Sequence, residues 1–171
     1  MTKRWKPSES SNYHLTEWTY DNAGRVTLES NYFNSIEKNG DTIGGAATNA
    51  YTYNIDSEIS EIISNNVGKT TYIYDNDGHV SRKTELLSGA RTKRTDYTHD
   101  FLGRVASETM YQEQNSLDGK PDNTTLFGLT TSYSYDANGN LITVVYPNGA
   151  ILNYEYDALN RQTVAKRAVL N

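Results

Sequence analysis

The sequence predicts an all-β fold: an antiparallel meander of about six β-hairpins in one open, twisted, solenoid-like sheet. Three observations predict it. Two aromatic residues recur at positions i and i+2, an Asp or Asn follows them directly, and a turn residue stands three positions later. Side chains at i and i+2 share one face of a strand. With 171 residues, we treat the chain as one repeat domain, residues 1–171.

Six segments share this pattern, and we number them repeats 1 to 6. They span residues 18–28, 51–61, 72–82, 97–107, 133–143 and 154–164. Their anchor residues, which follow the second aromatic position, are Asp21, Asn54, Asp75, Asp100, Asp136 and Asp157. Successive anchors are 33, 21, 25, 36 and 21 residues apart. The spacing of 21 is expected to be the bare unit, and the two longest spacings to contain loops at residues 37–49 and 115–125.

The aromatic pair is expected to end the first strand of each hairpin. The pairs are Trp18 and Tyr20, Tyr51 and Tyr53, Tyr72 and Tyr74, Tyr97 and His99, Tyr133 and Tyr135, and Tyr154 and Tyr156. Tyrosine combines a large apolar ring with a hydroxyl that can stay hydrated, so the 14 tyrosines allow a sheet to bury area on one side only. The sequence does not indicate which face of the sheet carries them.

The anchor and the residue three positions after it are expected to form the turn. An Asp side chain can accept a hydrogen bond from the backbone two residues later, and Gly adopts the positive φ that closes the hairpin. The turn glycines are Gly24, Gly78, Gly103 and Gly139. Asn160 replaces Gly in repeat 6 and tolerates the left-handed conformation. Ser57 replaces it in repeat 2, where we expect a different turn.

The segment from repeat 5 to repeat 6 predicts the rest of the unit. A strand begins at Leu141, a second turn follows at Pro147, Asn148 and Gly149, and the next strand returns to the anchor of repeat 6. This arrangement predicts strands of about seven residues and roughly a dozen strands in total. Residues 157–170 have some helical spacing, but their alignment with the repeat favours a strand.

Composition limits the classes of partner. The formal net charge is −5, which argues against nucleic acid as the main partner. The chain has no Cys, which excludes disulfides and cysteine-based metal sites. Its first twenty residues lack the apolar stretch of a signal peptide or a transmembrane helix. We expect no cofactor.

Candidate catalytic and metal residues are few. His14, His79 and His99 are the only histidines, and their spacing matches no zinc motif, so no metal site is predicted. His99 beside Asp100 could form a catalytic pair, but a planar ring that replaces Tyr explains it and is the favoured interpretation. A GxSxG nucleophile motif is absent, and we predict no catalytic residue.

Two further charged features have both a functional and a structural interpretation. Asp75, Asp77 and Gly78 imitate the start of a calcium loop, and turn chemistry accounts for all three. The basic residues near repeat 3 could bind an anionic glycan, although cross-strand charge pairing is favoured. These residues are Arg82, Lys83, Arg91, Lys93 and Arg94. An Asn-Thr-Thr glycosylation sequon begins at Asn123 and matters only in a secreted eukaryotic protein.

The iterated pattern, as in YSYDANGN and YIYDNDGH, resembles the YD repeat of the RHS family. That family includes Rhs polymorphic toxins, shell subunits of insecticidal toxin complexes, wall-associated bacterial proteins and teneurins. The resemblance covers roughly residues 13–166. The RHS core element and a toxin domain are not recognisable in the sequence, because Pro7, Pro121 and Pro147 never follow an Asp.

The resemblance implies a non-catalytic segment of a shell that encloses or presents a toxin domain. It also implies that the segment is secreted or lies at the cell surface as part of a larger protein. The expected partners are neighbouring repeats or other copies, which would meet at the sheet edges. A carbohydrate-binding or adhesive module is the alternative, because exposed Tyr and Trp rings can stack on sugars. The contact residues for a glycan are not predictable from the sequence.

Overall fold

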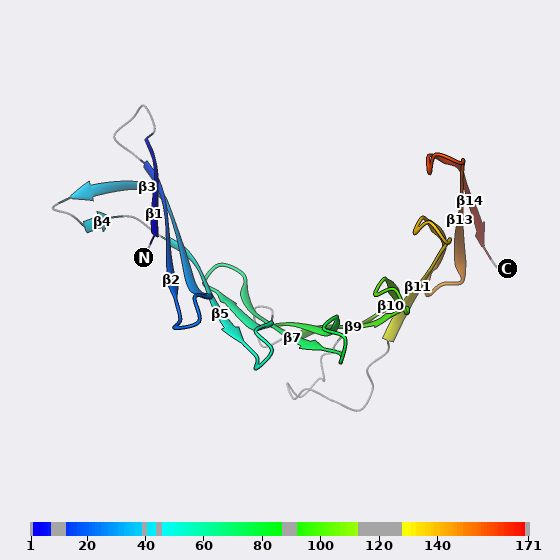
Figure 1. Ribbon diagram of the computed structural model, residues 1–171, viewed down its shortest axis with the longest axis horizontal. Coiled ribbons are helices and arrows are strands. Elements are labelled where there is room, and N and C mark those ends of the chain that lie inside the picture. Colours follow the sequence, from blue (N-terminus) through cyan, green and yellow to red (C-terminus); the bar gives the residue numbers. More distant parts are fainter. Residues whose placement is uncertain are drawn as a thin grey trace, which may run out of the picture. The chain divides into compact units, whose positions relative to one another are not determined.

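The computed structural model of the chain describes residues 2–7, 13–38, 41–43, 46–86, 92–112 and 128–169. These residues form β-strands and turns, which confirms the all-β prediction. Figure 1 shows the strands along the chain, which divides into two compact units. Unit 1 contains residues 1–72 and 85–90, and unit 2 contains residues 73–84 and 91–171. Among the described residues, no helix is long and apolar enough to cross a membrane.

The strands of unit 1 pair with their neighbours in the chain, always antiparallel. They are β1 (Thr2–Pro7), β2 (Tyr13–Tyr20), β3 (Val26–Lys38), β4 (Asp41–Ile43), β5 (Ala46–Tyr53), β6 (Ile59–Ser64) and most of β7 (Gly68–Tyr74). β3 pairs with β5 over its first half and with β4 over its last residues. β4 is thus a short side branch of the meander.

Unit 2 continues the same alternation. Its strands are most of β8 (Val80–Leu86), then β9 (Thr92–His99), β10 (Val105–Gln112), β11 (Gly128–Tyr135), β12 (Leu141–Val145), β13 (Ala150–Tyr156) and β14 (Gln162–Val169). Each pairing from β9 to β14 is antiparallel. The hydrogen-bonded order of the 14-stranded sheet follows the chain, with β4 off the path. Residues 157–170 therefore contribute a strand, as predicted.

One predicted loop is wrong and one lies outside the described residues. Residues 37–49 contain the end of β3, all of β4 and the start of β5. The physical reason is the sequence around Thr42 and Ile43, since both are β-branched residues that fit a pleated strand better than a loop. The loop predicted at residues 115–125 falls among residues that the structure does not describe.

The six anchor turns share one backbone geometry. The anchor N–H donates to the carbonyl four residues later, and the N–H of the third residue after the anchor returns to the anchor carbonyl. The four turn glycines have φ between 76° and 90°. Ser57 and Asn160 take the same place, with φ of 68° and 60°. The prediction of a different turn at Ser57 is therefore wrong, because the serine accepts the left-handed conformation.

A β-bulge follows the anchor turns of repeats 1, 2, 4, 5 and 6. The strand after the turn has one extra residue, six positions past the anchor, that faces no single partner. These residues are Thr27, Ser60, Ala106, Ile142 and Thr163. A bulge interrupts the ladder and increases the local twist. It leaves the carbonyl of the preceding residue available to a side chain.

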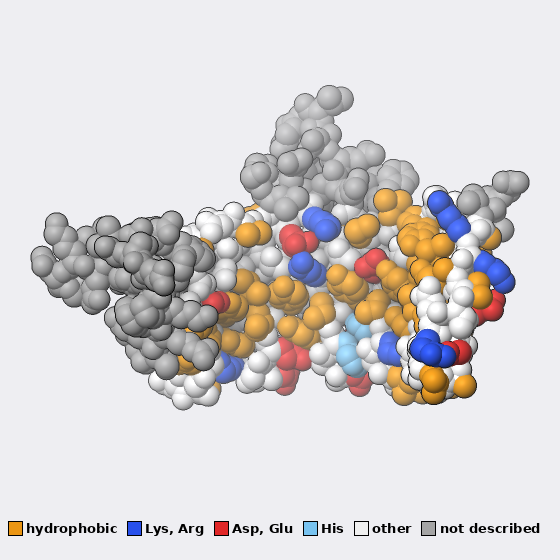
Figure 2. All heavy atoms as spheres, turned by 90° about the horizontal axis from the view of Figure 1, so that it is seen from above, with side chains coloured by type: hydrophobic (Ala, Val, Ile, Leu, Met, Phe, Trp, Pro, Cys, Tyr) orange, Lys and Arg blue, Asp and Glu red, His pale blue; other side chains and the backbone are white. Residues whose placement is uncertain are grey.

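The sheet has few fully buried apolar side chains. Among the described residues these are Leu15, Val144 and Ala150, and most other strand positions are half-buried. Figure 2 shows hydrophobic side chains along the visible face, with the histidines (pale blue) beside acidic and basic groups. A single apolar core therefore contributes little here, and contacts between successive hairpins become the main source of order.

Candidate functional site: the joints between repeats

Each anchor side chain first holds its own turn. In repeat 1, Asp21 Oδ1 accepts the N–H groups of Ala23 and Arg25, both at 2.9 Å. Asp21 Oδ2 accepts a hydrogen bond from Arg25 Nε at 2.8 Å. The backbone bond from Arg25, followed by its side-chain bond, lowers the pKa of Asp21. The anchor stays ionised and draws the residue four positions later back over the turn.

The residue four positions after the anchor is the polar partner in every repeat. Arg104 and Arg161 repeat this ion pair, and in both the Nε and Nη2 atoms contact Oδ2 of the anchor, Asp100 or Asp157. In repeat 2 the polarity is reversed, because Asn54 Nδ2 donates to Glu58 Oε2 at 2.7 Å. Anchor and partner thus keep one contact while they exchange donor and acceptor roles.

The same partner reaches the next repeat, and we call this contact a joint. The guanidinium carbon of Arg25 lies 4.6 Å from the centroid of the Tyr53 ring, and its Nη1 donates to Ser57 Oγ at 3.0 Å. Arg104 lies 4.6 Å from the Tyr135 ring centroid, and its Nη1 donates to the Asp136 carbonyl at 3.2 Å. A cation–π contact and a hydrogen bond to the next turn therefore accompany the same ion pair.

Tyrosine hydroxyls add a second bond to the joint. The second Tyr of repeats 2, 5 and 6 donates to the carbonyl that precedes the bulge of the repeat before it, at 2.7–2.9 Å. These pairs are Tyr53 with Val26, Tyr135 with Val105, and Tyr156 with Leu141. The bulge thus leaves an acceptor that the next repeat uses.

The first Tyr of a pair can bind a carboxylate instead. The hydroxyls of Tyr51 and Tyr133 donate to Glu29 and Glu108 at 3.0 and 2.7 Å. Desolvation first, and then the neighbouring glutamate, raises the pKa of both tyrosines. They stay protonated as donors. The hydroxyls of both tyrosines are thus engaged in hydrogen bonds within the sheet.

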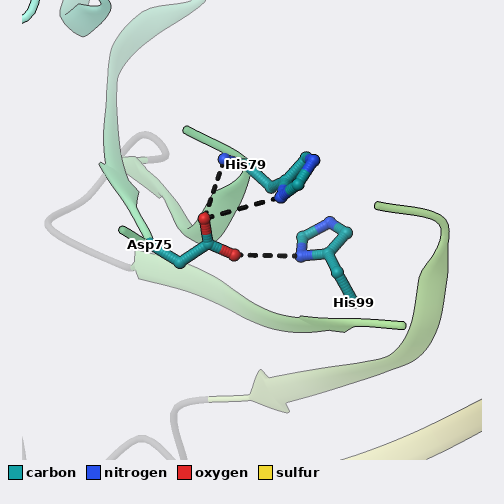
Figure 3. A group of neighbouring side chains, drawn as sticks. All are labelled: Asp75, His79 and His99. Atoms are coloured by element: carbon teal, nitrogen blue, oxygen red, sulfur yellow. Dashed lines mark hydrogen bonds and ion pairs between the residues drawn. The ribbon is translucent and has the colours of Figure 1, made fainter. Parts of the chain in front are cut away.

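Between repeats 3 and 4, two histidines occupy the joint. His79 stands where repeats 1 and 4 have Arg, and His99 stands where the next repeat has Tyr. Their ring centroids are 4.8 Å apart, with the planes inclined by 29°. The Nδ1 atoms of His79 and His99 lie 3.6 and 3.5 Å from the two carboxylate oxygens of Asp75 (Figure 3).

This geometry assigns His99 a different partner from the one suggested by the sequence. His99 pairs with Asp75 of the preceding repeat, whereas the sequence suggested Asp100, whose carboxylate holds its own Arg104. Asp75 Oδ1 accepts the N–H groups of Asp77 and His79 at 3.0 and 2.9 Å, which is turn chemistry. The backbone bond from His79 is the largest cause that lowers the Asp75 pKa.

The joint between repeats 5 and 6 uses amides. Asn140 Nδ2 donates to Asp136 Oδ2 and to Asn160 Oδ1, both at 2.9 Å. Asn138 Nδ2 also reaches Asn160 Oδ1 at 3.2 Å. Asn160 therefore serves the turn through its left-handed backbone and the joint through its side chain, which explains why a residue larger than glycine is useful there.

Two of the basic residues near repeat 3 form ion pairs with one carboxylate, Arg82 from the neighbouring strand and Arg94 from the same strand. Arg82 on β8 and Arg94 on β9 both donate to the carboxylate of Asp96. Hydrogen bonds from Arg94, and then from Arg82, lower the pKa of Asp96 to about 2. Arg94 also lies 4.7 Å from the Tyr111 ring centroid. This supports the structural interpretation of these two arginines; Arg91 lies outside the described residues.

The RHS Repeat family matches the chain twice, over residues 124–151 and 135–168. The two matches contain the anchors Asp136 and Asp157. Residues 124–168 of this chain carry RHS repeats. The resemblance inferred from the YD pattern is confirmed, and the RHS repeat accounts for a structural role of the segment. The four other anchors, which lie before the matched residues, form the same turn.

Three solved structures are similar to this chain. TcdB2-TccC3 without its hypervariable C-terminal region is 14% identical, with a TM-score of 0.43, and the match covers 92% of this chain and 10% of that chain. The Photorhabdus luminescens Tc holotoxin pore is 12% identical, with a TM-score of 0.39, over 92% and 11% of the two chains. A porin-like protein from Bacteroides uniformis is 12% identical, with a TM-score of 0.36, over 96% and 92%.

This chain thus spans about a tenth of the length of the TccC3-containing chains. No curated protein matches it.

The aromatic pairs of the RHS repeats lie where the sequence predicted them. They end strands β2, β5, β7, β9, β11 and β13, and the anchor follows each strand. Sequence reasoning missed the partner four residues after the anchor and its contact with the next repeat. The signal was present, since that position is Arg in three of six repeats and Glu where the anchor is Asn.

Proposed function

We propose that the chain is a non-catalytic wall segment of an RHS-type shell that encloses or presents a toxin domain. The joints carry this proposal, because polar groups of repeats 1, 3, 4 and 5 contact both their own turn and the following repeat. Arg104 is the clearest case: one side chain pairs with Asp100, stacks on Tyr135 and bonds to the next turn. Such side chains support a wall rather than a reaction.

The family match supports the proposal from a second direction. RHS repeats cover residues 124–168, and the resemblance implies a shell around toxic cargo. The partners would be further repeats at the sheet edges and the cargo domain, and the protein would act outside the producing cell. The proposal includes no enzyme activity, in line with anchors and tyrosines that are engaged in structural bonds.

The test is protease protection of a neighbouring domain. The coding sequence of this chain would be expressed together with the coding sequence that adjoins it in its genome, and the product would be treated with trypsin. We expect the domain joined to the repeats to be digested much more slowly than the same domain expressed by itself. A variant with a weakened joint, Arg104→Ala with Tyr135→Phe, should open the wall and speed its digestion.

Arg161→Ala is the matched control, since Arg161 makes the same anchor ion pair with a side chain that is 73% exposed. It should leave the protection unchanged. Equal digestion of the adjoining domain in the wild type, the joint variant and the free form would refute the shell role. A glycan array probed with the chain addresses the adhesive alternative, and a blank array is the outcome that the proposal expects.

A further inference from the structure

We propose that Asp75, His79 and His99 form a binding site for a divalent transition-metal ion of the Zn²⁺ class, which would link repeats 3 and 4. The two imidazoles and the carboxylate offer one ligand atom each, and these atoms lie within 4.8 Å of one another. All three residues belong to unit 2, so the site is contained in one compact unit.

The orientation of the three side chains supports a metal site. Both histidines turn Nδ1 toward the carboxylate of Asp75, one toward each oxygen (Figure 3). On the opposite side of the His79 ring, Nε2 faces Gly103, where a Cβ would lie only 2.4 Å away. The glycine therefore admits the ring edge and leaves Nδ1 as the His79 nitrogen that faces the other ligands. The rings converge on one carboxylate rather than on separate partners.

The ligand chemistry indicates the class of ion. Two imidazoles and one carboxylate are a common ligand set of zinc sites that keep one position open to water. Zn–N distances near 2.0–2.1 Å and Zn–O distances of about 2.0–2.2 Å require the ligand atoms to approach one another further. The interatomic distances of 3.5 and 3.6 Å leave room for this through side-chain rotation. Hard cations such as Ca²⁺ prefer oxygen ligands and suit the site less well.

Access and rigidity are both present. The side chain of His99 is 12% exposed and is held by its stack on His79. The side chains of Asp75 and His79 are 33% and 37% exposed, so an ion can enter from solvent. Bound metal would add a link where other joints have an arginine, and it would stabilise unit 2 in proportion to its binding free energy.

The spacing rules used on the sequence could not reveal this site. Asp75 and His79 belong to one turn, while His99 lies in the strand of the next repeat, so no local motif brings them together. The prediction of no metal site followed from local spacing alone. The proposal departs from that prediction because the joint supplies a ligand that is distant in the sequence.

The test is isothermal titration of the full chain, without a histidine tag, with ZnCl₂, and parallel titration with CoCl₂ followed by visible absorption. We expect one ion per chain and a d–d absorption band typical of low-coordinate cobalt. The double variant His79→Arg with His99→Tyr restores the residues found at the joints of Arg25 and Arg104, and it should lose the binding event. Asp75→Asn, which copies the anchor of repeat 2, should weaken binding at least tenfold.

His14→Gln is the control, because it removes the third histidine and keeps the cluster intact. Its zinc isotherm should match that of the wild type. The proposal fails if the wild type shows no saturable binding, or if the double variant binds zinc as well as the wild type does. In the first case, the two imidazoles would serve only as a stacked pair next to the Asp75 carboxylate.

Discussion

Two joints of unit 2 fill one position with different chemistry. Between repeats 4 and 5, Arg104 carries a permanent charge and reaches past its own anchor to the Tyr135 ring and the next turn. Between repeats 3 and 4, two stacked imidazoles meet at Asp75 and lean against Gly103. The backbone of the turns is the same in both. The fold therefore requires a contact at the joint and leaves its chemistry open.

The difference indicates which kind of substitution should disrupt each joint. The arginine joint depends on one long side chain, which tolerates small backbone changes because it can adjust. The histidine joint depends on close approach of a ring to a glycine, so it depends on backbone space. Four predictions test this contrast, ordered by the expected size of the effect.

The largest effect is expected at the glycine of the histidine joint. Gly103→Ala places a Cβ 2.4 Å from His79 Nε2 at a φ of 76°, so the ring must move in addition to the strain of the turn. We expect a loss of about 3 kcal/mol in the free energy of unfolding, of which about 1–2 kcal/mol is left-handed strain. Urea denaturation followed by circular dichroism would measure it.

Gly139→Ala is the matched control beside the arginine joint. Its φ is 90°, and the nearest atom to a new Cβ is Arg104 Nη1 at 3.9 Å, an ordinary contact. It should cost only the strain, about 1–2 kcal/mol. When His79→Ala is also present, Gly103→Ala should lower the free energy of unfolding by about as much as Gly139→Ala does. Equal losses for Gly103→Ala and Gly139→Ala in the otherwise unchanged chain would contradict the contrast.

Removal of the arginine should break the other joint. Arg104→Ala loses the ion pair with Asp100, the contact with Tyr135 and the bond to the Asp136 carbonyl. We expect a loss of about 2 kcal/mol, mostly from the cation–π contact and the hydrogen bond. Arg161→Ala, measured in the same denaturation experiment, should cost about 0.5 kcal/mol or less, because exposed ion pairs contribute little. A similar cost for both would mean that the joint adds nothing.

The reversed pair of repeat 2 gives a double-mutant test. Asn54→Asp sets a carboxylate against Glu58, where an amide now donates at 2.7 Å, and should destabilise unit 1 by about 1 kcal/mol. Adding Glu58→Arg recreates the pair of repeat 1 and should recover most of that loss. The coupling energy of the cycle measures the contact; additive effects of the two substitutions would contradict it.

The smallest effect is expected from acid at Asp96. Its pKa is lowered from 3.8 to about 2 by the bonds from Arg94 and Arg82, so its contribution to stability is present above pH 3.8 and is lost as the pH falls through about 2. The side chain is 25% exposed, so we expect on the order of 1 kcal/mol. Asp96→Asn should flatten this part of the stability–pH curve. Identical curves for wild type and variant would argue against the ion pairs.

The sequence predicted those features that reside within one hairpin. The aromatic pair, the anchor and the turn glycine are local, and the strand ends follow from them. Ser57 misled because a positive φ is costly for serine, whereas its hydroxyl accepts a bond from Arg25 that helps to offset this cost. The partner four residues after the anchor was visible in the sequence, but its contact with the next repeat was not, because that contact depends on the register between hairpins separated by variable loops.

The reach of the joints also has a consequence for how the protein folds. The joint contacts between Arg25 and Ser57 and between Arg104 and Asp136 both connect residues 32 positions apart. The entropic cost of closing a loop rises only slowly with its length, so a hairpin formed at any anchor turn can add the neighbouring hairpin next. The folded sheet would extend by one hairpin at a time, toward either end of the chain. A damaged turn would then stall the growing sheet at that repeat, while the hairpins already formed on either side persist.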